Sequence, residues 1–145
     1  MILVDANLLL YAYHARADQH SASKAWLETA LAGPELVRFA WLTLWAFVRI
    51  ATNPRAFERP LSLREAESVV SSWLAQPTVA ILEPGERHWE ILRGLMRESQ
   101  TIGPLVMDAA LAALALEHGA TLCTTDRDFS RFPGLRWTNP LAASD

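Results

Sequence analysis

Short apolar segments alternate with longer helical patterns along the chain, and this alternation constrains the fold more than any other feature. Strand-like segments are expected at residues 1–4, 36–39, 79–82, 120–124 and 135–138. Helices are expected between them, at residues 7–15, 21–31, 42–52, 62–75, 87–99 and 107–118. Wholly apolar strands are typical of a parallel sheet that is buried on both faces. We therefore predict the α/β class, with a three-layer α/β/α sandwich around a central, mainly parallel sheet of four to five strands.

Capping residues set the expected ends of several helices. Ser21 and Ser62 precede helical patterns and are candidate N-caps, because a serine oxygen can accept a hydrogen bond from the first-turn N–H groups. Gly119 follows the last helical pattern, where a left-handed residue commonly ends a helix. No repeat, low-complexity tract or linker interrupts the pattern, so we expect one domain over residues 1–145.

Charge, hydrophobicity and cysteine content argue against several classes of protein. The net charge of −3 at pH 7 argues against a nucleic-acid coat protein, which would be basic. The longest nearly uncharged stretch, residues 40–48, falls far short of the ~18 apolar residues that a membrane span needs. The first residues lack the basic segment of a signal peptide. The lone Cys123 cannot form an internal disulfide. We therefore expect a cytoplasmic protein with no membrane partner.

Three aspartates are expected at one end of the predicted sheet. Asp5 ends the first strand, Asp126 directly follows the strand at residues 120–124, and Asp108 lies in the first turn of the helix before that strand. Ligands of open α/β sheets bind beyond the carboxyl ends of the strands. The three carboxylates can therefore meet there if the first and fourth strands are neighbours. Each aspartate alone also has a structural explanation, as a helix cap, a partner of the helix dipole or a turn residue.

A group of carboxylates in this arrangement favours metal chemistry. Clustered carboxylates repel one another unless a cation neutralises them. Ligand sets made only of oxygen suit Mg²⁺ or Mn²⁺. Such an ion lowers the pKa of a bound water and stabilises negative charge on a phosphodiester.

Other chemistries have less support in the sequence. The four histidines show no zinc-type spacing, and nucleotide-binding and serine-hydrolase motifs are absent. A phosphoacceptor domain also clusters acids at strand ends, but it would carry a lysine at the end of a late strand, and Lys24 is the only lysine. We interpret the six tryptophans as core or contact residues rather than as base-stacking platforms.

Several motifs occur in a characteristic order. They are LVDANLLLY at residues 3–11, FVRIATNPR at 47–55, VMDAALAALA at 106–115, GATL at 119–122, TTDRDF at 124–129 and FPGL at 132–135. In this order and spacing the motifs resemble the PIN-domain family, and within it the VapC-type toxins of bacterial toxin–antitoxin pairs. The resemblance covers nearly the whole chain.

The resemblance implies a PIN-like sandwich and a toxin that is an Mg²⁺- or Mn²⁺-dependent endoribonuclease, which cleaves RNA and so inhibits translation and growth. It also implies a cognate VapB-type antitoxin, together with a homodimer and a toxin–antitoxin hetero-oligomer. Carried over residue by residue, Asp5, Asp108 and Asp126 match the acidic cluster, as catalytic residues and as metal ligands.

Five further residues are candidates for supporting roles. Asn7, Thr124 and Thr125 match polar positions that line the site in the family, and Arg49 matches a basic position in the third helix. Asp128, two residues beyond the last of the three acids, is a candidate supporting acid.

One position departs from the family pattern. Many PIN domains carry a glutamate three residues before the basic residue of the third helix, and here that position is Ala46. No acid occurs anywhere between residues 39 and 55. The departure favours one firmly held metal ion rather than two. It also motivates an alternative function, a catalytically weakened PIN domain that binds RNA or an antitoxin without cleaving RNA.

Overall fold

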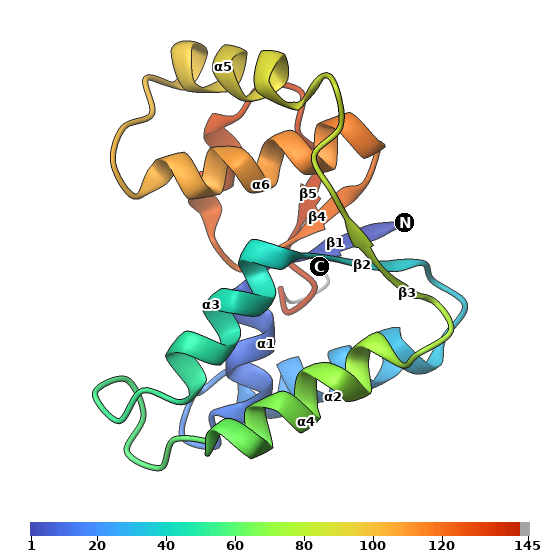
Figure 1. The fold of residues 1–145 in the computed structure, drawn as a ribbon, viewed down its shortest axis with the longest axis vertical. Coiled ribbons are helices and arrows are strands. Elements are labelled where there is room, and N and C mark those ends of the chain that lie inside the picture. Colours follow the sequence, from blue (N-terminus) through green and yellow to red (C-terminus); the bar gives the residue numbers. More distant parts are fainter. Residues whose placement is uncertain (143–145) are drawn as a thin grey trace.

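Five parallel strands form one sheet in the order β3-β2-β1-β4-β5 (Figure 1). The computed structural model describes residues 1–142. The strands are β1 (Ile2–Val4), β2 (Val37–Ala40), β3 (Val79–Leu82), β4 (Thr121–Cys123) and β5 (Trp137–Thr138). This architecture confirms the predicted α/β class and the predicted number of strands.

Helices cover both faces of the sheet, as expected for apolar parallel strands. They are α1 (Ala6–Tyr13), α2 (His20–Ala32), α3 (Trp41–Ala51), α4 (Leu63–Leu74), α5 (His88–Ser99) and α6 (Leu105–His118), and a short 3₁₀ helix η1 (Arg127–Arg131) follows β4. Figure 1 shows α5 and α6 on one side of the sheet and α1 to α4 on the other. Successive residues of β1 alternate between the two cores, because Leu3 packs with α5 and α6 whereas Val4 packs with α1, α2 and α3. No helix within residues 1–142 is long and apolar enough to cross a membrane.

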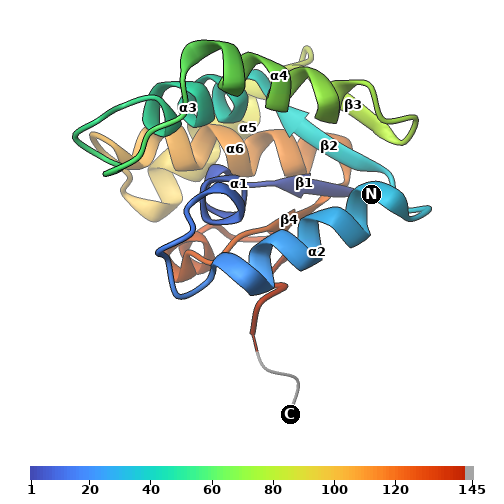
Figure 2. The ribbon, with the colours of Figure 1, turned by 90° about the horizontal axis from the view of Figure 1, so that it is seen from below.

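The central pairing of β1 with β4 brings two distant parts of the chain together. Val4 pairs with Cys123 in a parallel register, so the residues that follow them, Asp5 and Thr124, lie side by side at the carboxyl edge. The backbone N–H of Asp5 donates to the carbonyl of Cys123 over 3.0 Å. In Figure 2, β1 runs directly into α1 at this edge. The strand order therefore builds one end of the sheet from the segments that carry the candidate aspartates.

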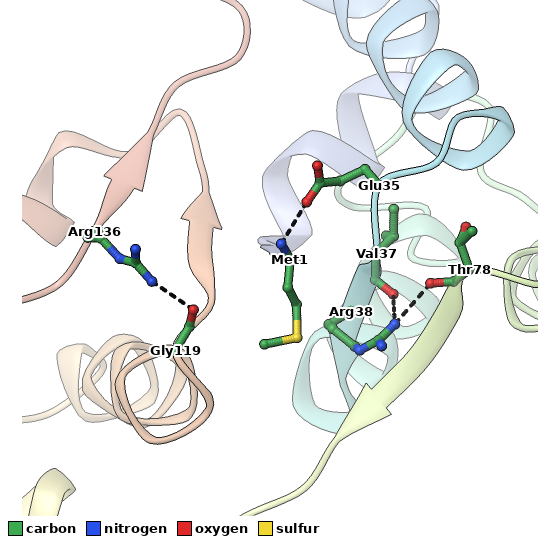
Figure 3. Close-up of polar contacts among 7 residues, drawn as sticks. All are labelled: Met1, Glu35, Val37, Arg38, Thr78, Gly119 and Arg136. Carbon is green, nitrogen blue, oxygen red and sulfur yellow. Dashed lines mark hydrogen bonds and ion pairs between the residues drawn. The ribbon is translucent and has the colours of Figure 1, made fainter.

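The opposite edge of the sheet is occupied by structural contacts (Figure 3). The amino group of Met1 pairs with the Glu35 carboxylate over 2.7 Å. Arg38 donates to backbone carbonyls at the starts of β2 and β3 over 3.1 and 2.9 Å. Arg136 donates to the Gly119 carbonyl over 2.7 Å, just before β4. These bonds connect the amino ends of neighbouring strands to each other. The candidate aspartates lie at the other edge, where the strands end.

Two predicted helix starts have different outcomes. Ser62 is the N-cap of α4 as predicted, with a reciprocal bond to Glu65 that completes a capping box. The prediction for Ser21 is wrong, because α2 begins at His20 and its N-cap, Gln19, makes no side-chain capping bond. The turns that precede α2 already place Gln19 in the helical region, at φ −82° and ψ −1°, so the helix starts earlier than its first serine.

Gly119 joins α6 to β4 in the conformation predicted for a C′ residue. Its φ of +67° lies in the left-handed region, which glycine adopts without strain. The reversal lets the N–H of Ala120 donate to the carbonyl of Ala115 over 2.9 Å, as in a Schellman motif. The end of α6 therefore sets where β4 starts.

A pair of glycine substitutions tests this junction. Gly119→Ala should lower the free energy of unfolding by about 1–2 kcal/mol, because a Cβ is strained at positive φ even though nothing crowds it. Gly94→Ala should instead raise the free energy of unfolding by about 0.5–1 kcal/mol, because Gly94 lies inside α5 with open space around its Cα. Urea unfolding of both variants measures the two values. Equal effects of the two substitutions would contradict the assignment of Gly119 as the strained position.

Candidate functional site

Asp5 is held rigidly at the end of β1. One of its oxygens, Oδ1, accepts a 2.8 Å hydrogen bond from the N–H of Ala6, so Asp5 is the N-cap of α1. The other, Oδ2, accepts a 2.7 Å bond from the hydroxyl of Thr124. Burial raises the pKa of Asp5, and the two hydrogen bonds partly offset that rise. The prediction that Asp5 caps a helix is therefore confirmed. The same hydrogen bonds also fix the orientation of its carboxylate at the carboxyl edge of the sheet.

Thr124 connects the first aspartate to the third. Its side chain is fully buried, at 0% exposure, and its hydroxyl oxygen accepts a 3.0 Å hydrogen bond from the N–H of Asp126. One hydroxyl therefore donates to Asp5 and accepts from the backbone of Asp126. This bridge sets the spacing of the two acids across the β1–β4 pair.

Asp126 shapes the turn that follows β4. Its Oδ1 accepts a 2.8 Å bond from the N–H of Asp128, which makes Asp126 the N-cap of η1. Asp128 is exposed and pairs with Arg131 over 3.7 Å. Asp128 lies inside the first turn of η1, so the cap of this helix is Asp126.

Asp108 lies in the first turn of α6, across the site from β1. Its pKa is raised to about 6, chiefly by burial and then by the negative charges of Asp5 and Asp126. Asp108 lines the same cavity as Asp5 and Asp126. The segment that carries Asp108 therefore completes an acidic site from three separate parts of the chain.

The three aspartates line one cavity of about 650 Å³. Asn7, at the start of α1, also lines it. A single helix, α3, contributes five further lining residues, namely Leu42, Thr43, Trp45, Ala46 and Arg49. Met107 and Leu111 of α6 add to the apolar part of the lining. The lining thus combines three carboxylates with an aromatic and a basic side chain.

The donor set of the cavity suits a hard divalent cation. Carboxylate oxygens are the preferred ligands of Mg²⁺ and Mn²⁺. The lining also includes Thr43, which is 1% exposed and whose buried hydroxyl has no hydrogen-bond partner within residues 1–142. In the same part of the chain, no three His, Cys, Asp or Glu side chains form a tightly gathered metal-binding group. The chemistry and charge of the carboxylates therefore suit a divalent cation, although the described residues do not bring three of them together as a ready-made metal site.

The remaining sequence candidates separate into two groups. Arg49 and Asn7 line the cavity, whereas Thr125 and Asp128 do not. Ala46 lies on the cavity wall, so no acid extends from the centre of α3. Sequence reasoning missed Thr43 and Trp45 as lining residues. Their spacing on one helix was the available signal, because residues three or four apart share a helix face. Trp45 lies four residues before Arg49, and Thr43 lies three residues before Ala46.

Comparison with known proteins places the chain in a family. Residues 2–135 match the model of the PIN domain. The chain belongs to the PIN-domain family. Ribonuclease VapC37 of Mycobacterium tuberculosis is 46% identical to this PIN domain over 142 residues, which are 98% of this chain and 99% of the relative. Ribonuclease VapC33 of the same species is 39% identical over 141 residues, 97% of this chain and 99% of the relative. The predicted membership of the VapC group is confirmed.

Solved structures share the PIN-domain architecture at low sequence identity. A chain of the Rickettsia felis VapBC2 complex, bound to a DNA fragment from its promoter, has a TM-score of 0.70 at 19% identity and covers 96% of this chain and 98% of that chain. VapC20 of Mycobacterium tuberculosis, described as a toxin that cleaves the sarcin–ricin loop, has a TM-score of 0.66 at 19% identity, with 94% and 99% covered. These likenesses support the fold.

The Thr124 bridge gives a first prediction for the site. Thr124→Val keeps the side-chain shape but removes the hydroxyl, which leaves the N–H of Asp126 without its acceptor. We expect the free energy of unfolding to fall by about 2 kcal/mol, the cost of leaving a buried polar group unpaired. Thr124→Ser keeps the hydroxyl and is the matched control, with a smaller loss. Urea unfolding in EDTA measures both, and equal losses would contradict the bridge.

The raised pKa of Asp108 gives a second prediction. Because its pKa in the folded chain, about 6, lies above the ordinary 3.8, the neutral carboxyl stabilises the fold below pH 3.8 and that stability is lost as the pH rises through 6. Asp108→Asn stays neutral at every pH. It should therefore stabilise the EDTA-treated protein at pH 7.5 by about 1 kcal/mol, a figure reduced for solvent screening. The gain should shrink toward pH 4. Thermal unfolding of both proteins across this range tests it, and a gain independent of pH would refute it.

Proposed function

We propose that this protein is a divalent-metal-dependent endoribonuclease that acts as the toxin of a toxin–antitoxin pair. The observation that carries the proposal is the gathering of Asp5, Asp108 and Asp126 around one cavity, in a chain 46% identical to Ribonuclease VapC37 over nearly its full length. Acids at the carboxyl edge of a parallel sheet occupy the place where α/β proteins bind ligands.

Asp5, Asp108 and Asp126 would hold one Mg²⁺ or Mn²⁺ ion. When bound, the ion supplies positive charge that acidifies a water and stabilises the charge developing on a phosphodiester. Asp5 presents a carboxylate whose two oxygens are already oriented by the N–H of Ala6 and the hydroxyl of Thr124. This preorganisation means that little ordering remains when substrate binds. Thr124 acts as a positioning residue, because it reaches the site only through the two acids.

The basic side of the cavity would hold the RNA backbone. Arg49 lines the same cavity as the acids, and a guanidinium can donate two parallel hydrogen bonds to a phosphate. Arg127, exposed at the start of η1, would contact the backbone outside the cavity. The acids would thus act at the scissile phosphate, and the arginines would bind the neighbouring phosphates.

The partners that we propose are RNA as the substrate, a VapB-type antitoxin and a second copy of the chain, in the cytoplasm. Several solved neighbours are toxin–antitoxin assemblies, including the Haemophilus influenzae VapBC-1 structure. Large apolar side chains stand exposed on α3, α5, α6 and the loop before α6, namely Trp41, Trp89, Ile102 and Met107. Exposed apolar surface of this kind is available for burial against protein partners.

Substitution of the acids tests the proposed activity. Asp5→Ala or Asp108→Ala should lower RNA cleavage about a hundredfold or more, since even groups behind metal ligands contribute 10–100-fold. Each should also relieve growth inhibition when the protein is expressed. Asp18→Ala is the matched control, because Asp18 is an exposed carboxylate in the loop before α2. Full activity of either purified acid variant would refute the site.

The same assay separates the proposed enzyme from a binding module. Wild-type protein should cleave single-stranded RNA with Mn²⁺ or Mg²⁺, and EDTA should abolish the cleavage. RNA binding without cleavage under any divalent cation would instead favour the alternative that Ala46 motivates. Cleavage that persists in EDTA would contradict the metal-dependent mechanism.

A further inference from the structure

One wall of the acid-lined cavity is a row of side chains on α3. Trp45, Ala46 and Arg49 all line the cavity, and the aromatic and basic residues are four positions apart on the same helix face. The row thus places an indole and a guanidinium one helical turn apart. The same cavity is lined by the three aspartates proposed to act on the phosphodiester.

The side chain of Trp45 is far more exposed to solvent than that of Trp73, a core tryptophan of the same chain. Its exposure is 67%, whereas Trp73 of α4 is 2% exposed and packs against Phe39 and Phe47. Exposing so much aromatic surface to water forgoes the burial that usually stabilises such a side chain. Trp45 is therefore not a core residue, and for this one tryptophan the role proposed below departs from the sequence-based interpretation. Its indole is available to cover an apolar surface brought by a ligand.

The guanidinium of Arg49 is also exposed and can bind a ligand. Within residues 1–142 it forms no ion pair. The position one turn before it, where many PIN domains carry a glutamate, is Ala46. No carboxylate on α3 therefore competes for the guanidinium or repels a phosphate that approaches it.

We propose that Trp45 and Arg49 form a nucleotide-binding wall, on which an unstacked base next to the scissile phosphate stacks on the Trp45 indole while Arg49 binds the adjoining phosphate. A nucleotide joins a flat base to an anionic phosphate, and the row on α3 presents the complementary pair of groups. The inference rests on the proposed ribonuclease function and names the residues of that site that would bind a nucleotide of single-stranded RNA.

The strand requirement follows from the geometry of stacking. In a duplex both faces of a base are covered by neighbouring bases, so an aromatic side chain can stack only on a base that is free of the helix. Stacking on an aromatic ring tolerates any base, because every base has a π-face. Trp45 therefore selects unpaired RNA without selecting a sequence.

Kinetic measurements on Trp45 variants test the wall. Trp45→Ala should raise KM for single-stranded RNA about tenfold, which corresponds to about 1.4 kcal/mol, and should leave kcat within about twofold because the acids are untouched. Trp45→Phe should restore most of the affinity, since a phenyl ring also stacks. Trp89→Ala is the matched control, because Trp89 is 63% exposed on α5 and lies outside the cavity lining.

Binding measurements on the Asp108→Asn background separate stacking from the chemical step. Anisotropy of a labelled single strand should show the same roughly tenfold loss on Trp45→Ala, for RNA and for DNA of the same sequence. A duplex of that sequence should bind both proteins equally. Arg49→Gln should weaken binding of all three ligands and reduce the salt dependence of the affinity.

The outcomes distinguish this inference from the proposed function. If Trp45→Ala changes neither KM nor the affinity for single strands, the proposed nucleotide-binding wall is wrong. EDTA-sensitive cleavage by the wild type would then still support the proposed function. Absence of EDTA-sensitive cleavage in the wild type would overturn the function itself. A lower molecular mass of Trp45→Ala in solution, with equal losses for single-stranded and duplex RNA, would also overturn the wall, because Trp45 would then be a contact between copies.

Discussion

The parallel pairing of β1 with β4 is the interaction on which the rest of the candidate site depends. Val4 and Cys123 are partners in this pairing, and the N–H of Asp5 continues it by donating to the Cys123 carbonyl. The pairing places the hydroxyl of Thr124 within 2.7 Å of the Asp5 carboxylate, although 119 positions separate them in the chain. Both strands are only three residues long. The contacts that anchor them at the other edge, such as Arg136 to Gly119, therefore matter for the site as well.

The buried aspartates of the candidate site lower the free energy of unfolding at neutral pH. Asp5 and Asp108 are both held where burial and neighbouring acids raise their pKa values, so ionising them costs folding free energy. A structure selected only for stability would replace one of them by a neutral side chain. The hydrogen bonds from Ala6 and Thr124 offset part of this cost at Asp5 and at the same time orient it. The cost at Asp108 is offset less, and there the charge of a bound cation would contribute most.

Much of the fold was predictable from local pattern, whereas the meeting of the three acids was predictable only on the condition that the first and fourth strands are neighbours. The alternation of apolar and helical segments was enough to predict the sheet and to place Asp5 and Asp126 at strand ends. Helix starts were less predictable, because α2, α5 and α6 begin without a side-chain capping bond and leave no mark in the sequence. Turn chemistry was also ambiguous, since either Asp126 or Asp128 could have capped η1. Only the packed structure shows which face of α3 meets the acids, because that helix is apolar on most of its surface.

The orientation of α3 changes the meaning of the position at which this chain departs from its family. From sequence alone, Ala46 is a missing carboxylate and therefore a weakened metal site. In the structure, Ala46 lies between Trp45 and Arg49 on the cavity wall. A glutamate there would be one turn from the guanidinium, close enough to pair with it, and its charge would repel a phosphate. A methyl group at this position thus leaves fewer ligands for a cation, together with an arginine that forms no ion pair within residues 1–142 and an exposed indole. In the proposed site, metal ligands and nucleotide contacts would draw on the same helix, and the α3 residues of this chain would suit the nucleotide better than the metal.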